Sequence, residues 1–285
     1  MAAPIEHPVK TLTEFAKHVE DALDLSRGKY GAKPSIVNWY RGSGESTTGK
    51  LVPKLYRHPT MKTANELLVL ERQMLNWFKR QSILHQTLTP NIDPDYEYLF
   101  FMQHYGVPTR LLDWTGNPFI ALYFALTSAP YDATHNRYNE DAAVWILSPN
   151  AWNERSLLDI SWGPKGPVGI EDSEKSGYAP RTSDDPNDLK AMYELPIAMH
   201  GIPNNTRMFA QKGVFTIFGK VTDPMEKIFS DSAYPVESLV KLTVDKGDIP
   251  NFLDRVLSVG FTDSVSYPDL HGLALEIKRH FGFRM

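Results

Sequence analysis

The sequence predicts a single α+β domain in which helices are inserted between the strands of one central sheet. Two observations predict this class. Short runs of bulky apolar residues, typical of buried strands, lie at residues 35–42, 109–115 and 142–148. Segments with apolar residues at helical spacing lie between them, and neither an internal repeat nor a clean linker divides the chain. Because 42% of the 285 residues are apolar, the chain can bury a sizeable core.

The composition narrows the possible functions. The net charge of −4 gives the chain as a whole no positive field for non-specific nucleic-acid binding, although a local basic groove remains compatible with it. The absence of cysteine excludes disulfides, thiolate metal sites and a cysteine nucleophile. The N-terminus has no apolar leader, and no stretch reaches the length of a membrane span. We therefore expect no membrane partner and a cytoplasmic location.

Two capping boxes mark helix starts in the first third of the chain. Thr11 with Glu14 opens the first helix, so we expect an N-terminal helical segment at 1–30 and a domain at 31–285. A second box begins at Thr63 and opens a longer amphipathic helix.

The remaining elements follow from local signals. Asn117 followed by Pro118 predicts a helix start directly after the strand at 109–115. Residues 161–188 are rich in Gly, Pro, Ser and charge, which predicts a long mobile surface loop. The other expected elements are strands at 207–219 and 236–245 and helices at 96–105, 249–260 and 270–282.

An arginine at the end of the first strand is one candidate binding residue. Arg41 precedes Gly42, and glycine lets another backbone or a ligand approach closely. A guanidinium at this place suits a phosphate or carboxylate ligand. The alternative is an ordinary strand-end arginine paired with a surface acid.

A second group of candidates lies in the strand before the capped helix. Arg110, Asp113 and Thr115 approach the N-terminus of that helix, whose free N–H groups attract anions, so together they predict an anion site. The alternative is that Asp113 caps the helix, or pairs with Arg110 so that both are buried.

Further candidates lie in two other segments. His104 titrates near neutrality and suits a general base, although a histidine beside aromatic residues is also a common structural residue. No second histidine stands at metal-ligand spacing, so we expect no metal. Arg207 and Gln211 share a face whether the segment is helical or extended, and the Gln211 amide suits a base or a ribose. The alternative is a pair of edge-strand polar residues.

Several motifs together resemble the FRG domain family. They are YRG at 40–42, the LxPKLYR stretch at 51–57, QHYGVPTRLLDWT with the following NPxxALYFA at 103–125, the segment at 207–215 and YPDLHGLA at 267–274. They span about residues 37–276, and Tyr40 stands where the family usually has phenylalanine. The family layout is similar to that of ADP-ribosyltransferases, which implies a mixed or antiparallel sheet split around a nucleotide cleft.

The resemblance implies roles for the candidates. Arg41 would hold the phosphates or nicotinamide ribose of NAD, which would be the substrate, and Thr115 or Thr109 would orient the arginine and the ribose. Gln211 occupies the third motif, but the glutamate expected beside it is absent, so Asp113 or Glu194 would have to supply the carboxylate. The residues expected around the nucleotide are Tyr40, Arg41, Gly42, His104, Thr109, Arg110 and Asn117.

The function implied by the resemblance is that of an NAD-dependent ADP-ribosyltransferase-like toxin or effector, in phage defence or a toxin–antitoxin system. Its target would be a nucleic acid or a protein, and an antitoxin or chaperone would be its partner. One alternative is a non-catalytic nucleotide or nucleic-acid sensing module. A second is a nuclease or hydrolase that uses His104 with Asp113.

Overall fold

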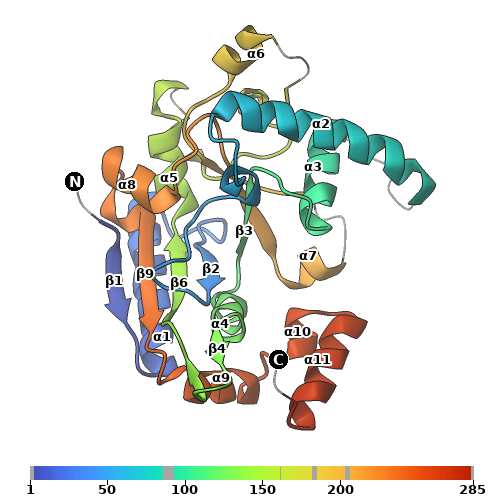
Figure 1. The fold of residues 1–285 in the computed structure, drawn as a ribbon. Helices are drawn as coiled ribbons and strands as arrows, with labels where there is room; N and C mark the ends of the chain where they lie inside the picture. The colour runs from blue at the N-terminus through green and yellow to red at the C-terminus, as the bar shows by residue number, and fades with distance from the viewer. Residues whose placement is uncertain (1–2, 86–92, 161, 182–184, 203–205, 284–285) are drawn as a thin grey trace.

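The computed structural model describes residues 3–85, 93–160, 162–181, 185–202 and 206–283 (Figure 1). These residues form one seven-stranded sheet in the order β1-β9-β6-β2-β3-β8-β7, with β1 parallel to β9 and the other neighbours antiparallel. This confirms the α+β class and the mixed sheet. The strands are β1 (Ile5–Pro8), β2 (Trp39–Ser43), β3 (Leu111–Thr115), β6 (Ala142–Leu147), β7 (Ile197–Met199), β8 (Gly213–Ile217) and β9 (Leu239–Val244). A separate hairpin joins β4 (Tyr131–Asp132) to β5 (Arg137–Tyr138).

The sheet is divided in its middle. β2 pairs with β6 over five residue pairs, and β3 pairs with β8 over five more. Between β2 and β3, by contrast, the described residues make one pair, Tyr40 opposite Thr115. The sheet therefore consists of two half-sheets, β1-β9-β6-β2 and β3-β8-β7, which meet at a single point.

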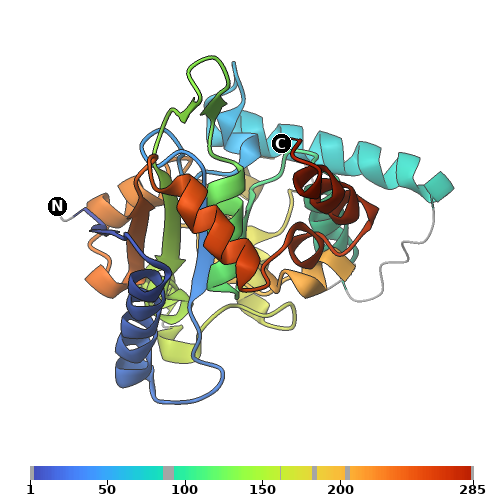
Figure 2. The same cartoon turned by 90° about the horizontal axis from the view of Figure 1, so that it is seen from below.

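Helices cover both faces of the sheet (Figures 1 and 2). The longer ones are α1 (Leu12–Tyr30), α2 (Ala64–Ser82), α3 (Pro94–His104), α4 (Pro118–Thr127), α9 (Ile249–Ser258) and α11 (Leu270–His280). The shorter ones are α5 (Pro149–Ser156), α6 (Pro186–Ala191), α7 (Thr206–Ala210), α8 (Met225–Asp231) and α10 (Asp263–Ser266). None of the helices in these ranges is both long and apolar enough to cross a membrane.

The helix starts that the sequence predicted are confirmed. The Thr11 hydroxyl accepts the backbone N–H of Glu14 at 3.1 Å. Thr63 and Glu66 form the reciprocal capping box at the start of α2. Both caps satisfy N–H groups that the first helical turn leaves unpaired. Because these signals involve neighbouring residues, they can be identified without tertiary information.

The core lies on both faces of the sheet because side chains alternate along each strand. Trp39 and Trp114 belong to an apolar cluster on one face, with Trp152 from α5. Tyr40 belongs to the cluster on the other face, where α1, α4 and α9 pack. A third cluster joins α3 to β7 and β8 around Phe100.

Close packing of α4 on β2 explains the glycine after Arg41. A Cβ at Gly42 would lie 2.0 Å from the carbonyl oxygen of Ala121, and one at Gly44 would lie 2.3 Å from the backbone of Ser128. Both glycines therefore allow the helix backbone to lie directly against the strand. The sequence predicted that either another backbone or a ligand approaches Gly42 closely, and the backbone of α4 does so.

The short α10–α11 unit is anchored by a buried carboxylate. Asp263 accepts hydrogen bonds from Arg279 at 2.8 and 3.0 Å and from the hydroxyl of Tyr123 in α4. Burial alone raises the pKa of Asp263, but the hydrogen bonds from Arg279 and Tyr123 lower it more, and the net shift is downward. The carboxylate thus fixes the C-terminal helices to the core in its ionised form.

Three expectations are corrected by the structure. The described part of 161–188 contributes buried side chains to the core, among them Trp162 and Tyr178, as well as exposed ones such as Glu171, so it does not lie wholly on the surface. The segment 207–219 is not one strand, because α7 occupies its first part and β8 begins at Gly213. The N-terminal segment is not purely helical, since β1 joins the main sheet beside β9.

Candidate functional site

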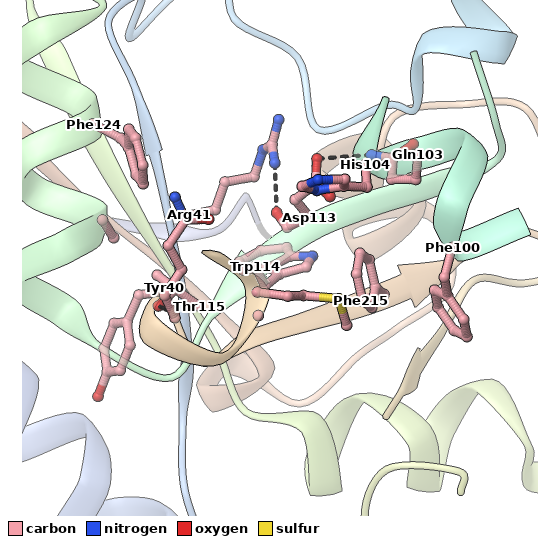
Figure 3. Close-up of a pocket in the computed structure, with 15 residues that line it drawn as sticks. Tyr40, Arg41, Phe100, Gln103, His104, Asp113, Trp114, Thr115, Phe124 and Phe215 are labelled. Atoms are coloured by element: carbon pink, nitrogen blue, oxygen red, sulfur yellow. Dashed lines mark hydrogen bonds between the residues drawn. The ribbon is translucent and has the colours of Figure 1, made fainter. Parts of the chain in front are cut away.

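A cavity of about 360 Å³ lies where the two half-sheets separate (Figure 3). Its volume falls within the range of small-molecule pockets, roughly 300–1,000 Å³. Six elements contribute its lining: Tyr40, Arg41 and Gly42 from β2; Asp113, Trp114 and Thr115 from β3; Phe100, Gln103 and His104 from α3; Ala121 and Phe124 from α4; Met208 from α7; and Gly213 and Phe215 from β8. Gln211 joins them from the turn between α7 and β8. The cavity therefore combines residues far apart in the sequence.

The side chain of Arg41 crosses the divide between the half-sheets. It follows Tyr40, the last β2 residue paired with β3, and its Nη1 donates to the backbone carbonyl of Asp113 (Figure 3). Burial lowers the pKa of Arg41, the carboxylate of Asp113 opposes that shift, and the nearby Arg57 adds to it. A guanidinium nevertheless keeps its charge in proteins. One wall of the cavity thus carries a fixed positive charge.

The carboxylate of Asp113 lies on the facing strand and is oriented by a chain of hydrogen bonds. The buried Thr109 hydroxyl accepts the N–H of Leu111 at 3.1 Å and donates to Gln103 Oε1 at 2.6 Å. Gln103 Nε2 in turn donates to Asp113 Oδ2 at 2.7 Å. An amide N–H can only donate, so Gln103 fixes the orientation of the Asp113 carboxyl group.

Gln103 is a site residue that the sequence reasoning missed. It stands at the start of the motif that runs from 103 to 125, and this position was the available signal. Its contact with Asp113, ten residues later, depends on how α3 packs beside β3.

Thr115 and Gln211 hold the other end of the cavity. The Thr115 hydroxyl donates to the backbone carbonyl of Gln211 and accepts the N–H of Asn117 at 3.0 Å. The Gln211 amide donates to the Ser266 carbonyl at 2.8 Å, which links the cavity wall to α10. Thr115 therefore fixes the turn into α4, and Gln211 connects the site to the C-terminal helices.

Some predicted site residues lie outside the cavity. Asn117 caps α4, with its side-chain oxygen 3.0 Å from the N–H of Phe119. Thr109 is buried and does not line the cavity, and its link to the site is its hydrogen bond to Gln103. Glu194 forms an ion pair with Lys220 at 2.7 Å.

Arg110 also lies outside the cavity, in the core. Its Nε is 2.7 Å from Glu71 Oε2, and both side chains are buried. The guanidinium also donates to the backbone carbonyls of Phe218, at 3.1 Å, and Tyr178. Arg110 thus pairs with Glu71 rather than with Asp113, and it does not line the cavity.

The last two residues predicted for the site are His104 and Arg207. His104, the last residue of α3, lines the cavity, with its ring 4.9 Å from that of Tyr105. The side chain of Arg207 lies outside the described residues. In the part of the chain that the structure describes, no three His, Asp or Glu side chains gather as metal ligands.

The fold and the cavity define an α+β domain with a pocket in a divided sheet. Residues 37–134 match the family model of the FRG domain, which confirms the family predicted from the motifs. The match includes β2, β3 and α4, whereas the motifs at 207–215 and 267–274 lie beyond it. No curated protein and no solved structure matches the chain.

Proposed function

We propose that the cavity binds NAD as a substrate and that the chain transfers ADP-ribose from it to a nucleic acid or a protein. The observation that supports this proposal is the pairing of opposite charges in one cavity, Arg41 on β2 and Asp113 on β3. NAD carries both a negative pyrophosphate and a positive pyridinium ring. A guanidinium suits the former and a carboxylate suits the latter.

The size and lining of the cavity support the same ligand. A volume of about 360 Å³ is at the small end of ligand pockets, so we place the nicotinamide ribose and one phosphate inside it. The rings of Trp114, Phe124 and Phe215 offer flat apolar walls for the nicotinamide. The rest of the substrate would extend out of the cavity.

The proposed reaction breaks the bond between ribose C1′ and the nicotinamide nitrogen. Both bonding electrons pass to that nitrogen, so nicotinamide leaves as a neutral molecule. The nucleophile of the target bonds to C1′ and releases its proton to the His104 imidazole or to water. Positive charge develops on the ribose in the transition state, and Asp113, oriented by Gln103, would stabilise it.

The biological role in this proposal is that of a toxin or defence effector, restrained by an antitoxin or chaperone. The family resemblance supports that role.

The test uses NAD labelled separately on the nicotinamide and on the adenylate, incubated with total RNA, DNA or lysate. We expect nicotinamide release and transfer of the adenylate label. Arg41→Lys should lower both almost as strongly as Arg41→Ala, because a lysine cannot make the two-donor contact of arginine with phosphate. The matched controls are Arg80→Lys and Arg80→Ala on the exposed face of α2, which should retain activity.

Three outcomes would contradict the proposal. Full activity of Arg41→Lys would show that Arg41 does not bind phosphate as described. Intact NAD with every fraction, from folded protein that nucleotides stabilise against heat, would favour the sensing module. Cleavage of RNA or DNA without NAD, lost in His104→Ala but retained in Arg41→Lys, would favour the nuclease.

A further inference from the structure

A second cavity, of about 580 Å³, lies at the C-terminal end of α4. Its lining residues come from the C-terminal end of α4, the β4–β5 hairpin, the start of α9 and the end of α11 with the residues that follow it. It shares no lining residue with the first cavity. The function proposed above makes no use of it.

The charged lining of the second cavity has one sign. Arg137, Lys246 and Arg279 line it, and its described lining contains no carboxylate. The charge of Arg279 is already neutralised, because its guanidinium forms an ion pair with the Asp263 carboxylate at 2.8 Å. Among the described residues, no carboxylate oxygen lies within salt-bridge distance of Arg137 or Lys246, and both residues are exposed.

The carboxylates near these two cations are engaged by other donors. Asp132, opposite Arg137 in the hairpin, accepts from the His135 ring at 2.6 Å. Asp141 accepts the backbone N–H of Lys246 at 2.9 Å. Both side chains point their oxygens at those partners, and neither lines the cavity. After the hydrogen bond with His135, Arg137 also contributes to the lowered pKa of Asp132 through its charge. In the described part of the chain, however, neither Arg137 nor Lys246 is held in an ion pair, so both remain accessible to an anion.

Aromatic rings line the same cavity as the cations. Tyr131 and Tyr138 pack edge to face with their ring centroids 5.1 Å apart, and Phe283 joins them from the end of α11. Rings beside cationic side chains are the combination by which proteins bind a stacked base and its phosphate. The volume of the cavity is also within the range of small-molecule pockets.

We propose that the second cavity binds a nucleotide, with its phosphate at Arg137 and Lys246 and its base against the ring of Tyr138 or Phe283. The site is independent of NAD chemistry in the first cavity. α4 connects the two cavities, because Phe124 lines the first and Thr127 lines the second. At 1.5 Å per residue these positions are about 5 Å apart along the helix. A free nucleotide and one unit of a single-stranded nucleic acid present the same chemistry, and the experiment separates them.

The experiment measures binding without NAD. Fluorescent single-stranded DNA and RNA oligonucleotides are titrated by anisotropy, and the four nucleoside monophosphates by calorimetry. The main variant is Arg137→Glu with Lys246→Glu. Its control, Lys33→Glu with Lys190→Glu, makes the same charge change at exposed positions away from the cavity. Tyr138→Ala tests the base contact.

We expect the main variant to weaken binding roughly tenfold or more, and Tyr138→Ala to weaken it about fivefold or more. The control pair should stay close to the unaltered protein. Equal affinity for monophosphates and oligonucleotides identifies a free nucleotide. Much tighter oligonucleotide binding that weakens with salt identifies a single strand.

Three results would overturn the proposal. The first is the absence of binding by either ligand class to folded protein. The second is an equal loss in the control pair, which would indicate a diffuse charge effect. The third is a loss confined to Arg41→Ala, which would place the ligand in the first cavity. Because NAD is absent, none of these results bears on nicotinamide release.

Discussion

Replacing Arg110 by methionine tests whether this residue stabilises the core or binds a ligand. Its side chain is 0% exposed and that of Glu71 is 1% exposed, so Arg110→Met leaves an unpaired carboxylate without solvent. Breaking such a pair costs about 3–5 kcal/mol. The carbonyls of Phe218 and Tyr178 also lose a donor, at about 1 kcal/mol each.

The sum is roughly 5 to 7 kcal/mol of lost unfolding free energy. A domain of ordinary stability has about 5–15 kcal/mol in total, so the single variant should be barely folded. The double variant Arg110→Met with Glu71→Leu removes both charges. It leaves the two carbonyls and the backbone N–H of Arg110, which Glu71 accepts at 3.3 Å, without partners, at about 3 kcal/mol together. We therefore expect the second substitution to restore about 2–4 kcal/mol of the free energy of unfolding.

Urea unfolding followed by fluorescence and circular dichroism measures these free energies, provided that the two signals coincide. A loss below about 1 kcal/mol in the single variant would refute the buried ion pair. A double variant as unstable as the sum of the two single ones would refute it as well. If Arg110 bound NAD instead, the double variant would be stable yet fail to release nicotinamide.

Three further predictions concern packing, orientation and pH. Gly42→Ala should lower the melting temperature strongly or prevent folding, since its Cβ would lie 2.0 Å from a backbone oxygen of α4. The control is Gly28→Ala in α1, where nothing lies within 4 Å of the added Cβ, and this variant should stabilise the protein by about 0.5–1 kcal/mol. A Gly42→Ala variant that melts at a higher temperature than Gly28→Ala would contradict the close packing of α4 on β2. Gln103→Glu replaces the donor to Asp113 by a like charge, so nicotinamide release should fall and its pH profile should shift upward; an unchanged profile would exclude the orienting role. The stability that the ionised Asp263 carboxylate contributes is present above the unfolded-state pKa of 3.8 and is lost as the pH falls through its lower folded-state pKa. Asp263→Asn should therefore be less stable than the unaltered protein near pH 7, with a gap that closes in acid, and a gap independent of pH in chemical unfolding would disprove this.

The sequence predicts those parts of the fold that depend on neighbouring residues. The capping residues Thr11 and Thr63 interact within their own helix turn, and both caps are present. The segment 161–188 has the composition of a loop, and the burial of Trp162 and Tyr178 has no periodic signature in it. Their contacts come from strands distant in the chain.

Local sequence also does not show which individual residues belong to the candidate site. Arg41 and Arg110 both lie beside an apolar strand, so local sequence does not distinguish them. One lines a cavity because β2 and β3 separate there, whereas the other meets Glu71, which lies 39 residues away on α2. The role of Gln103 likewise depends on two partners outside its own helix.

Because the two half-sheets meet at a single residue pair, little backbone pairing fixes the width of the cavity between them. Hydrogen-bonded ladders resist sliding because each bond is directional, but the apolar side chains that bridge β2 and β3 pack without a fixed direction. A small rotation about the Tyr40–Thr115 pair would open or close the cavity and leave both five-pair ladders intact. The Tyr40–Thr115 pair and the hydrogen bond from Arg41 to the Asp113 carbonyl thus link the two half-sheets at the cavity.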